Sequence, residues 1–399
     1  MKGQELVSPR SGAAGGHLSY YKEHGISPVR YNYADPASHF QRRDCLYRSL
    51  GLPPAAFRGV RVLEVAAGSG QNSLYVATRR PASYDLVEPN PAGLRDIEAA
   101  YAGLSLPHTA PELYTTRFED FAANASYDIV LCENWLGSLP HEIALIRKLA
   151  GLVAPGGVLV LTVVPHSGFF PNVVRKLLAL RAADVNAPFE GRVRQLAAMF
   201  GPHLSTIANM TRSHEDWVKD CLLNPHYLNV ALPLDTVVEA IGAEMEILAT
   251  FPRFSTDWRW FKALTGEGRS FNALALKACR ENVHNFIDYR AVFPVRAAEA
   301  NADLDKAFAE FHRSALDWQA AFEARDSATR ARLDADIAAR LDALAVMTGE
   351  IDPGLGEAVA ETADVWRQPA IGTDAIHGMR KFAGLFGRET VYVSFTRPI

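Results

Sequence analysis

A carboxylate and two glycines follow the first apolar run of the chain and indicate a ligand site. In VLEVAAGSGQNS, residues 62–73, Glu64 precedes Gly68 and Gly70 in the pattern E-x-x-x-G-x-G. Glycines at such a turn let the backbone approach a ligand closely. A carboxylate near the end of a strand attracts an ammonium group, directly or through water. The pattern therefore predicts a site for a cationic amino-acid nucleoside.

Two other nucleotide-binding turns fit this stretch less well. The phosphate-binding loop G-x-x-x-x-G-K-[ST] occurs nowhere in the chain. Gly68 and Gly70 match the first two places of the dinucleotide pattern G-x-G-x-x-G/A, but Ser73 occupies the third. A nicotinamide cofactor is therefore the weaker alternative.

Residues 60–165 alternate apolar runs of strand length with helical stretches, which is typical of βα units on a parallel sheet. The strands are expected at 60–65, 84–87, 114–118, 127–132 and 158–164, and the residues Ala154-Pro155-Gly156-Gly157 are expected to form a turn. The fold class is therefore α/β, with a Rossmann-like sheet and helical insertions.

The same pass along the chain predicts its domain organisation. The expected parts are a disordered leader at 1–16, a helical lid at 17–58, a cofactor-binding core at 59–169, a helical substrate cap at 170–235 and a second helical insertion at 257–388. Strands near 245–251 and 390–396 are expected to complete the core sheet.

Composition narrows the class of protein. The 399 residues are 48% hydrophobic and 22% charged with a net charge of −4, which is typical of a soluble globular protein. There is no basic excess to favour nucleic acid, and no apolar run approaches the roughly 18 residues of a membrane helix. The four cysteines form no Cys-x-x-Cys pair, which argues against a zinc or disulfide framework. We therefore expect a cytoplasmic protein without a membrane or nucleic-acid partner.

The region 60–165 resembles the class I S-adenosylmethionine-dependent methyltransferases, and Glu64 to Gly70 resembles their motif I. Their pattern places a ribose-binding acid at the end of the second strand, where DLVEPNP has Glu88. An acid near the adenine amino group is also usual, and RFEDF offers Glu119 or Asp120. The resemblance implies S-adenosylmethionine as cofactor. The remaining residues expected to contact it are Ala66, Asn72, Pro89, Phe118, Glu133 and Trp135.

Methyl transfer to a hydroxyl or ammonium group needs a base whose pKa lies near the working pH. Three candidates lie where strands of the core are expected to end: Glu133, His141 and His166. His166, in VVPHSGFF, is the first choice because the fourth and fifth strand ends border the acceptor pocket in the resembled family. No His/Asp/Glu group has metal-ligand spacing, so no metal is expected.

Three stretches outside the core are candidates for acceptor binding. Residues 17–44 carry Tyr21 and Tyr33 in an otherwise polar segment that suits a lid. Residues 213–227 carry Trp217, and residues 252–262 carry Arg253, Trp258 and Arg259. Guanidinium groups grip carboxylates and phosphates, so these residues predict a small acceptor that is anionic or sugar-like.

Two other functions fit the same cofactor site. An aminopropyl transferase shares the nucleoside pocket but would call for an acidic groove, whereas Arg253 and Arg259 favour anions. A catalytically silent assembly or regulatory protein would bind the cofactor for structural reasons. Its long C-terminal helices, rich in Ala, Leu and Arg, could carry a homodimer interface.

Overall fold

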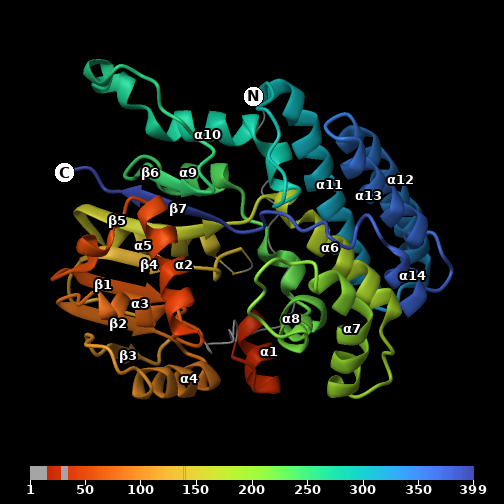
Figure 1. Ribbon diagram of the computed structural model, residues 1–399, viewed down its shortest axis with the longest axis horizontal. Helices are drawn as coiled ribbons and strands as arrows, with labels where there is room; N and C mark the ends of the chain where they lie inside the picture. Colours follow the sequence, from red (N-terminus) through yellow and green to blue (C-terminus); the bar gives the residue numbers. More distant parts are fainter. Residues whose placement is uncertain (1–15, 28–34, 138, 140) are drawn as a thin grey trace.

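A seven-stranded sheet forms the centre of one half of the molecule (Figure 1). A computed structural model describes residues 16–27, 35–137, 139 and 141–399. Residues 1–15 of the expected leader and the predicted acceptor residue Tyr33 lie outside these ranges. The strand order is β3-β2-β1-β4-β5-β7-β6. The strands are β1 (Arg61–Val65), β2 (Ser83–Val87), β3 (Glu112–Tyr114), β4 (Tyr127–Cys132), β5 (Val153–Val163), β6 (Glu246–Phe251) and β7 (Val391–Thr396).

Strand direction determines which residues meet at one edge of the sheet. Strands β1 to β5 are parallel, and β7 runs antiparallel to both β5 and β6. The first residue of β7, Val391, therefore pairs with Val163 at the end of β5. The segment before β7 thus reaches the same edge as the carboxyl ends of the parallel strands, where ligands bind in open α/β sheets.

Successive strand residues face opposite sides of the sheet, as the pleat requires. In β1, Val62 belongs to the core cluster beneath α2, α3 and α4, whereas Leu63 and Val65 belong to the cluster beneath α5, α9 and α10. All three side chains are at most 1% exposed. Helices thus cover both faces, which explains why β1 is almost continuously apolar.

The sheet-covering helices are α2 (Pro36–Ser49), α3 (Ser73–Thr78), α4 (Pro91–Ala102), α5 (Glu142–Gly151), α9 (Leu234–Ile241) and α10 (Phe271–Glu281). The other helices are α1 (Gly16–His24), α6 (His166–Ala182), α7 (Phe189–Leu204), α8 (His214–Trp217), α11 (Ala298–Glu323), α12 (Ser327–Gly349), α13 (Pro353–Trp366) and α14 (Thr373–Gly378). In the described part of the chain, none of the helices is both long and apolar enough to cross a membrane.

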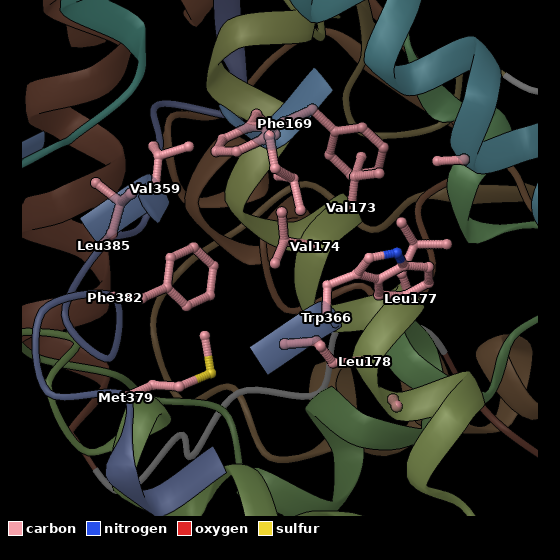
Figure 2. Packing of buried hydrophobic residues seen from close by; sticks show 14 of the residues in the cluster. Phe169, Val173, Val174, Leu177, Leu178, Val359, Trp366, Met379, Phe382 and Leu385 are labelled. Carbon is pink, nitrogen blue, oxygen red and sulfur yellow. The ribbon is translucent and has the colours of Figure 1, made fainter. Parts of the chain in front are cut away.

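A second half of the molecule is helical and packs around α6 (Figure 1). The α6 residues Phe169, Val173 and Leu177 meet Trp366 of α13 and Phe382 in one buried cluster (Figure 2). Helix α6 begins directly after β5 and its bridge residue Val164. Because its core is continuous with α7, α11 and α13, this helix joins the helical half to the site edge of the sheet.

Two local expectations were wrong. The third strand is Glu112–Tyr114 and not 114–118, because Phe118 leaves the sheet edge and packs with Phe121 in the core beneath α5. The stretch Ala154–Gly157 is part of β5 and not a turn. Its backbone pairs with the residue after β7: Gly156 N–H donates to the Arg397 carbonyl at 2.9 Å, and Arg397 N–H donates to Gly157 at 3.0 Å.

Candidate functional site

The glycine turn after β1 is tied to the end of β2 by a buried carboxylate. The Glu88 oxygens accept hydrogen bonds from Gly68 N–H at 2.8 Å and from Asn90 N–H at 2.8 Å. Glu88 is only 5% exposed, and burial raises its pKa to about 7 although both N–H donors lower it. A carboxylate offers about four acceptor positions, so two remain for a ligand diol. The residue thus fits the ribose-binding role that the resemblance implies.

The approach of α4 to this carboxylate depends on a glycine that the sequence analysis missed. A Cβ on Gly93 would lie 2.6 Å from the Gly68 carbonyl oxygen and 3.2 Å from Cγ of Glu88. Any side chain at position 93 would therefore push α4 away from the turn. The motif NPAG after Glu88 was the available signal for this close approach.

The turn itself holds three residues at positive φ. Ala66 (φ 59°), Gly68 (φ 58°) and Gly70 (φ 71°) alternate with right-handed or extended residues, and Ala66 N–H donates to Val87 at 2.9 Å. Asn72 precedes α3, and Pro89 lies between Glu88 and Asn90. Ala66, Gly68, Gly70 and Asn72 thus lie in the loop between β1 and α3, and Pro89 lies in the loop between the neighbouring strand β2 and α4.

Glu64 faces the sheet side covered by α3 and has both oxygens engaged by the protein. Oε1 accepts from the Ser73 hydroxyl at 2.9 Å, and Oε2 accepts from the Tyr84 hydroxyl. Burial raises the pKa of Glu64 to about 7, and the two hydroxyl donors oppose that rise. The carboxylate therefore positions the start of α3 within the fold, and no direct contact with a ligand ammonium is needed to explain its burial.

We expect Glu64 to make the stability of the ligand-free protein depend on pH. Its carboxyl keeps its proton to about pH 7 when folded but loses it near 4.5 when unfolded, so the folded state binds more protons between these values. The free energy of unfolding contributed by this group therefore falls as pH rises from 4.5 to about 7. Urea unfolding across this range should show a weaker fall in Glu64→Gln than in wild type, whereas the exposed Glu98→Gln should keep it. Equal slopes in wild type and Glu64→Gln would contradict the assignment.

Aromatic side chains gather beyond the ends of β3 and β4. Trp135 packs edge-on to Phe118 with ring centroids 5.7 Å apart. Glu119 and Asp120 are both exposed, and Glu119 pairs with Arg117 at 2.8 Å. An adenine packed against Phe118 and Trp135 would lie beside the loop that carries Glu119 and Asp120.

Glu133, at the end of β4, is paired with a buried cation from α2. Arg43 Nη2 lies 2.6 Å from Oε1 and 2.8 Å from Oε2, and the Tyr47 hydroxyl donates to Oε1 at 2.8 Å. Burial alone would lower the pKa of Arg43, but Glu133 and Tyr47 raise it well above its usual range. Glu133 thus serves as a counter-ion, and the engaged lone pairs make it a poor base. The sequence offered no signal for Arg43, which is 90 residues away.

His166 is the first residue of α6 and contacts His312 of α11. The two Nδ1 atoms lie 3.0 Å apart, and His312 Nε2 lies 2.6 Å from the Leu228 carbonyl oxygen. A carbonyl only accepts, so His312 carries its proton on Nε2 and accepts on Nδ1 from His166. His166 then presents the lone pair of Nε2, which has no hydrogen-bond partner among the described residues. Burial lowers the pKa of His166 to about 4 and that of His312 to about 3, so both rings are neutral at physiological pH.

The third expected base is placed differently. His141 starts α5 with a left-handed backbone (φ 60°) and an exposed side chain. Its carbonyl accepts from Ala144 and Leu145 N–H. The His141 backbone therefore caps the N-terminus of α5, while its ring is exposed to solvent.

Helix α1 bridges the helical half and the end of β2. The Tyr21 hydroxyl donates to Asp220 at 2.7 Å, and the Tyr20 hydroxyl donates to the Lys219 carbonyl at 2.7 Å. At the other end of this segment, Asn90 Nδ2 donates to the Ile26 carbonyl at 2.9 Å. The segment from α1 to Ile26 thus contacts Lys219 and Asp220 of the helical half and also Asn90, two residues after Glu88.

The predicted anion-binding residues are not brought together with these groups. Trp217 is 7% exposed and packs in the core of the helical half, whereas Trp258 is 91% exposed. Arg259 donates to Asp257 and to the Gly268 carbonyl, and Arg253 donates to the carbonyls of Arg48 and Ser49. Because both guanidinium groups already donate to acceptors of the chain itself, the expected grip on an anionic acceptor lacks support.

Known proteins match part of the chain. Residues 38–200 match a family model described as a methyltransferase domain. A ubiquinone biosynthesis O-methyltransferase from Xanthomonas axonopodis pv. citri (strain 306) is 26% identical over 218 residues, which cover 54% of this chain and 72% of that protein.

Solved structures match shorter parts. N-methyltransferase NodS from Bradyrhizobium japonicum WM9 is 16% identical, covers 37% of this chain and 74% of its own, and has a TM-score of 0.30. Magnesium protoporphyrin IX methyltransferase from Synechocystis PCC 6803 is 20% identical, covers 39% and 79%, and also has a TM-score of 0.30. A Thermoplasma acidophilum chain is matched over 44% of its length with a TM-score of 0.23, so this chain spans less than half of it.

Proposed function

We propose that this chain is an S-adenosylmethionine-dependent methyltransferase, with residues 38–200 as its methyltransferase domain, and that it methylates a hydroxyl group of a small molecule. The observation that carries the cofactor site is the hydrogen bond from Gly68 N–H to the buried Glu88 carboxylate. It joins the glycine turn after β1 to the acid at the end of β2.

In this proposal Glu88 holds the ribose hydroxyls with its free lone pairs, and Phe118 and Trp135 enclose the adenine. Glu119 or Asp120 faces the adenine amino group. Ala66, Gly68, Gly70, Asn72 and Pro89 supply the backbone of the cradle, and Glu64 holds that cradle in place through Ser73. When bound, S-adenosylmethionine supplies a methyl group activated by a positive sulfur.

His166 is the proposed base. The chain from the Leu228 carbonyl through His312 leaves the lone pair of His166 Nε2 free to accept the acceptor's proton. A neutral imidazole suits a neutral hydroxyl acceptor. The curated relative is an O-methyltransferase by name, which supports oxygen as the methylated atom.

The helical half and α1 are proposed to enclose the acceptor and exclude water. Tyr21 reaches Asp220, and Ile26 reaches Asn90 beside Glu88, so the segment after residue 16 acts as a lid over the edge of the sheet. From the composition we further propose that the enzyme is cytoplasmic and does not bind nucleic acid. From the long C-terminal helices we propose that it forms a homodimer through α11–α14.

Titration calorimetry with S-adenosylmethionine, paired with transfer of its labelled methyl group to pools of hydroxylated small molecules, tests this function. Glu88→Ala removes the ribose acceptor and the anchor of Gly68 N–H. We expect cofactor affinity to fall at least tenfold, a loss of about 1.4 kcal/mol. Glu98→Ala, an exposed acid on α4, should bind as wild type does.

Two outcomes would overturn the proposal separately. Unchanged affinity in Glu88→Ala would remove the ribose-binding assignment. Cofactor binding without any labelled product, across sugars, phosphosugars, phenols and hydroxy acids, would instead favour the silent assembly or regulatory protein.

A further inference from the structure

A carboxylate that the proposed reaction does not use lies beside the first turn of α6. Glu389 precedes β7, whose first residue pairs with the end of β5. The chain before it touches the helix: a Cβ on Gly168 would lie 2.3 Å from the Arg388 carbonyl oxygen. Glu389 therefore reaches the same edge of the sheet as His166, two residues before Gly168.

The Glu389 carboxylate has neutral donors but no counter-ion in the described part of the chain. Its Oε2 accepts from Asn172 Nδ2 and from the Tyr227 hydroxyl, the latter at 3.3 Å. The nearby guanidinium of Arg175 is spent on backbone carbonyls, including Leu385 at 2.9 Å. Arg212 is paired with Asp220 at 2.9 Å. A partly buried carboxylate without a counter-ion is costly, and burial accordingly raises the pKa of Glu389.

The Asn172 side chain that donates to this carboxylate also carries an acceptor atom. Asn172 is 4% exposed, and its Oδ1 is buried without a hydrogen-bond partner. The amide orientation follows from its neighbours, because Nδ2 must donate to the Glu389 carboxylate, where an amide oxygen would be repelled. Since Nδ2 is engaged, Oδ1 is the atom left for a ligand.

We propose that Glu389 and Asn172 form a subsite for a primary ammonium group of the acceptor molecule. The inference rests on the proposed function, because it assigns this group to the molecule that is methylated. An ammonium has three donors; two of them satisfy Asn172 Oδ1 and Glu389 Oε1, which has no partner among the described residues. A single hydroxyl has one donor and would leave one acceptor unpaired.

The position of the subsite relative to His166 supports one acceptor bridging both. The Phe169 ring packs against both the Tyr227 ring (centroids 5.2 Å apart) and the His312 ring (5.7 Å). Tyr227 holds Glu389, and His312 holds His166. The acceptor class that fits is therefore an amino alcohol, with its hydroxyl at His166 and its ammonium at Glu389.

Thermal unfolding of the full chain in methylammonium chloride and in tetramethylammonium chloride, at equal concentration, tests the subsite. Both cations carry one positive charge, but only methylammonium donates hydrogen bonds. We expect a higher unfolding midpoint in methylammonium, because a ligand that binds the folded state stabilises it. The difference should disappear in Glu389→Gln and shrink in Asn172→Leu. Glu244→Gln, an acid paired with Arg397 elsewhere, should retain it.

Equal midpoints for wild type in the two salts would overturn the proposal, whether or not either variant folds. So would a difference that persists in Glu389→Gln, because surface carboxylates would then account for it. The measurement uses neither cofactor nor methyl transfer. A failure of the methyltransferase assay therefore leaves the readout intact, and a failure of this readout leaves the methyltransferase assignment standing.

Discussion

His166→Gln is expected to lower kcat for methyl transfer by about a hundredfold or more, the usual contribution of a positioned base. Glutamine keeps a donor toward His312 but has no basic nitrogen lone pair that could take the acceptor's proton. Because His166 follows β5, whereas the glycine turn follows β1 and Glu88 follows β2, cofactor affinity should not change. Steady-state kinetics with an acceptor found by the labelled-methyl screen, beside calorimetry with S-adenosylmethionine, measures both quantities.

The pH profile of wild type adds a readout specific to a base. Burial, aided by the positive charge of Arg313, lowers the pKa of His166 to about 4, so the ring loses its proton there. The rate should fall below about pH 4 and remain level above it, provided that the protein stays folded. The surface His108→Gln should show wild-type kinetics. A normal kcat in His166→Gln would transfer the role of base to another group.

Arg43→Met is expected to destabilise the protein by about 3–5 kcal/mol, since it leaves a buried carboxylate without its counter-ion. Arg43 is 6% exposed, and the side chain of Glu133 is 10% exposed. The pair joins α2 to the end of β4, and the Arg43 guanidinium also stacks over the Tyr47 ring at 4.7 Å. Urea unfolding monitored by circular dichroism gives the free-energy difference.

Arg48→Met on the same helix is the matched control. Its guanidinium is 67% exposed and lies 3.7 Å from Asp44, and such surface pairs contribute about 0–1 kcal/mol. If Arg43→Met cost no more than Arg48→Met, the buried pair would not be a structural tie. Glu133 would then again be a candidate base.

The local sequence pattern was sufficient to predict the strands at the edge of the sheet where we propose that the cofactor binds. The strand expected at 127–132 is the observed β4, and β1 begins one residue after its expected start. Glu64, Gly68 and Glu88 were recognisable because each belongs to a continuous stretch in which a buried strand ends in a turn. The Rossmann-like α/β fold expected from these runs is confirmed by the sheet order.

The local sequence pattern gave wrong predictions where a residue packs against, or pairs with, a distant part of the chain. Phe118 was assigned to a strand because it is apolar, but its ring packs beneath α5. The glycines at 156 and 157 suggested a turn, but the residues after β7 pair with them. Trp217, Arg253, Trp258 and Arg259 were all predicted to bind the acceptor. In the structure Trp217 lies in a core, Trp258 is exposed, and both arginines donate to carbonyls of the chain itself.

The sequence by itself was sufficient to predict the strands at this edge and a nucleoside site beside them, because a turn and its flanking strand are encoded by neighbouring residues. Only the tertiary structure decided which polar groups meet at the acceptor side. His312 is 146 residues from His166, and Glu389 is 217 residues from Asn172. No periodicity reports a contact across such separations, because the packing of α6 against α11 and against the segment before β7, and not any local preference, brings these side chains together.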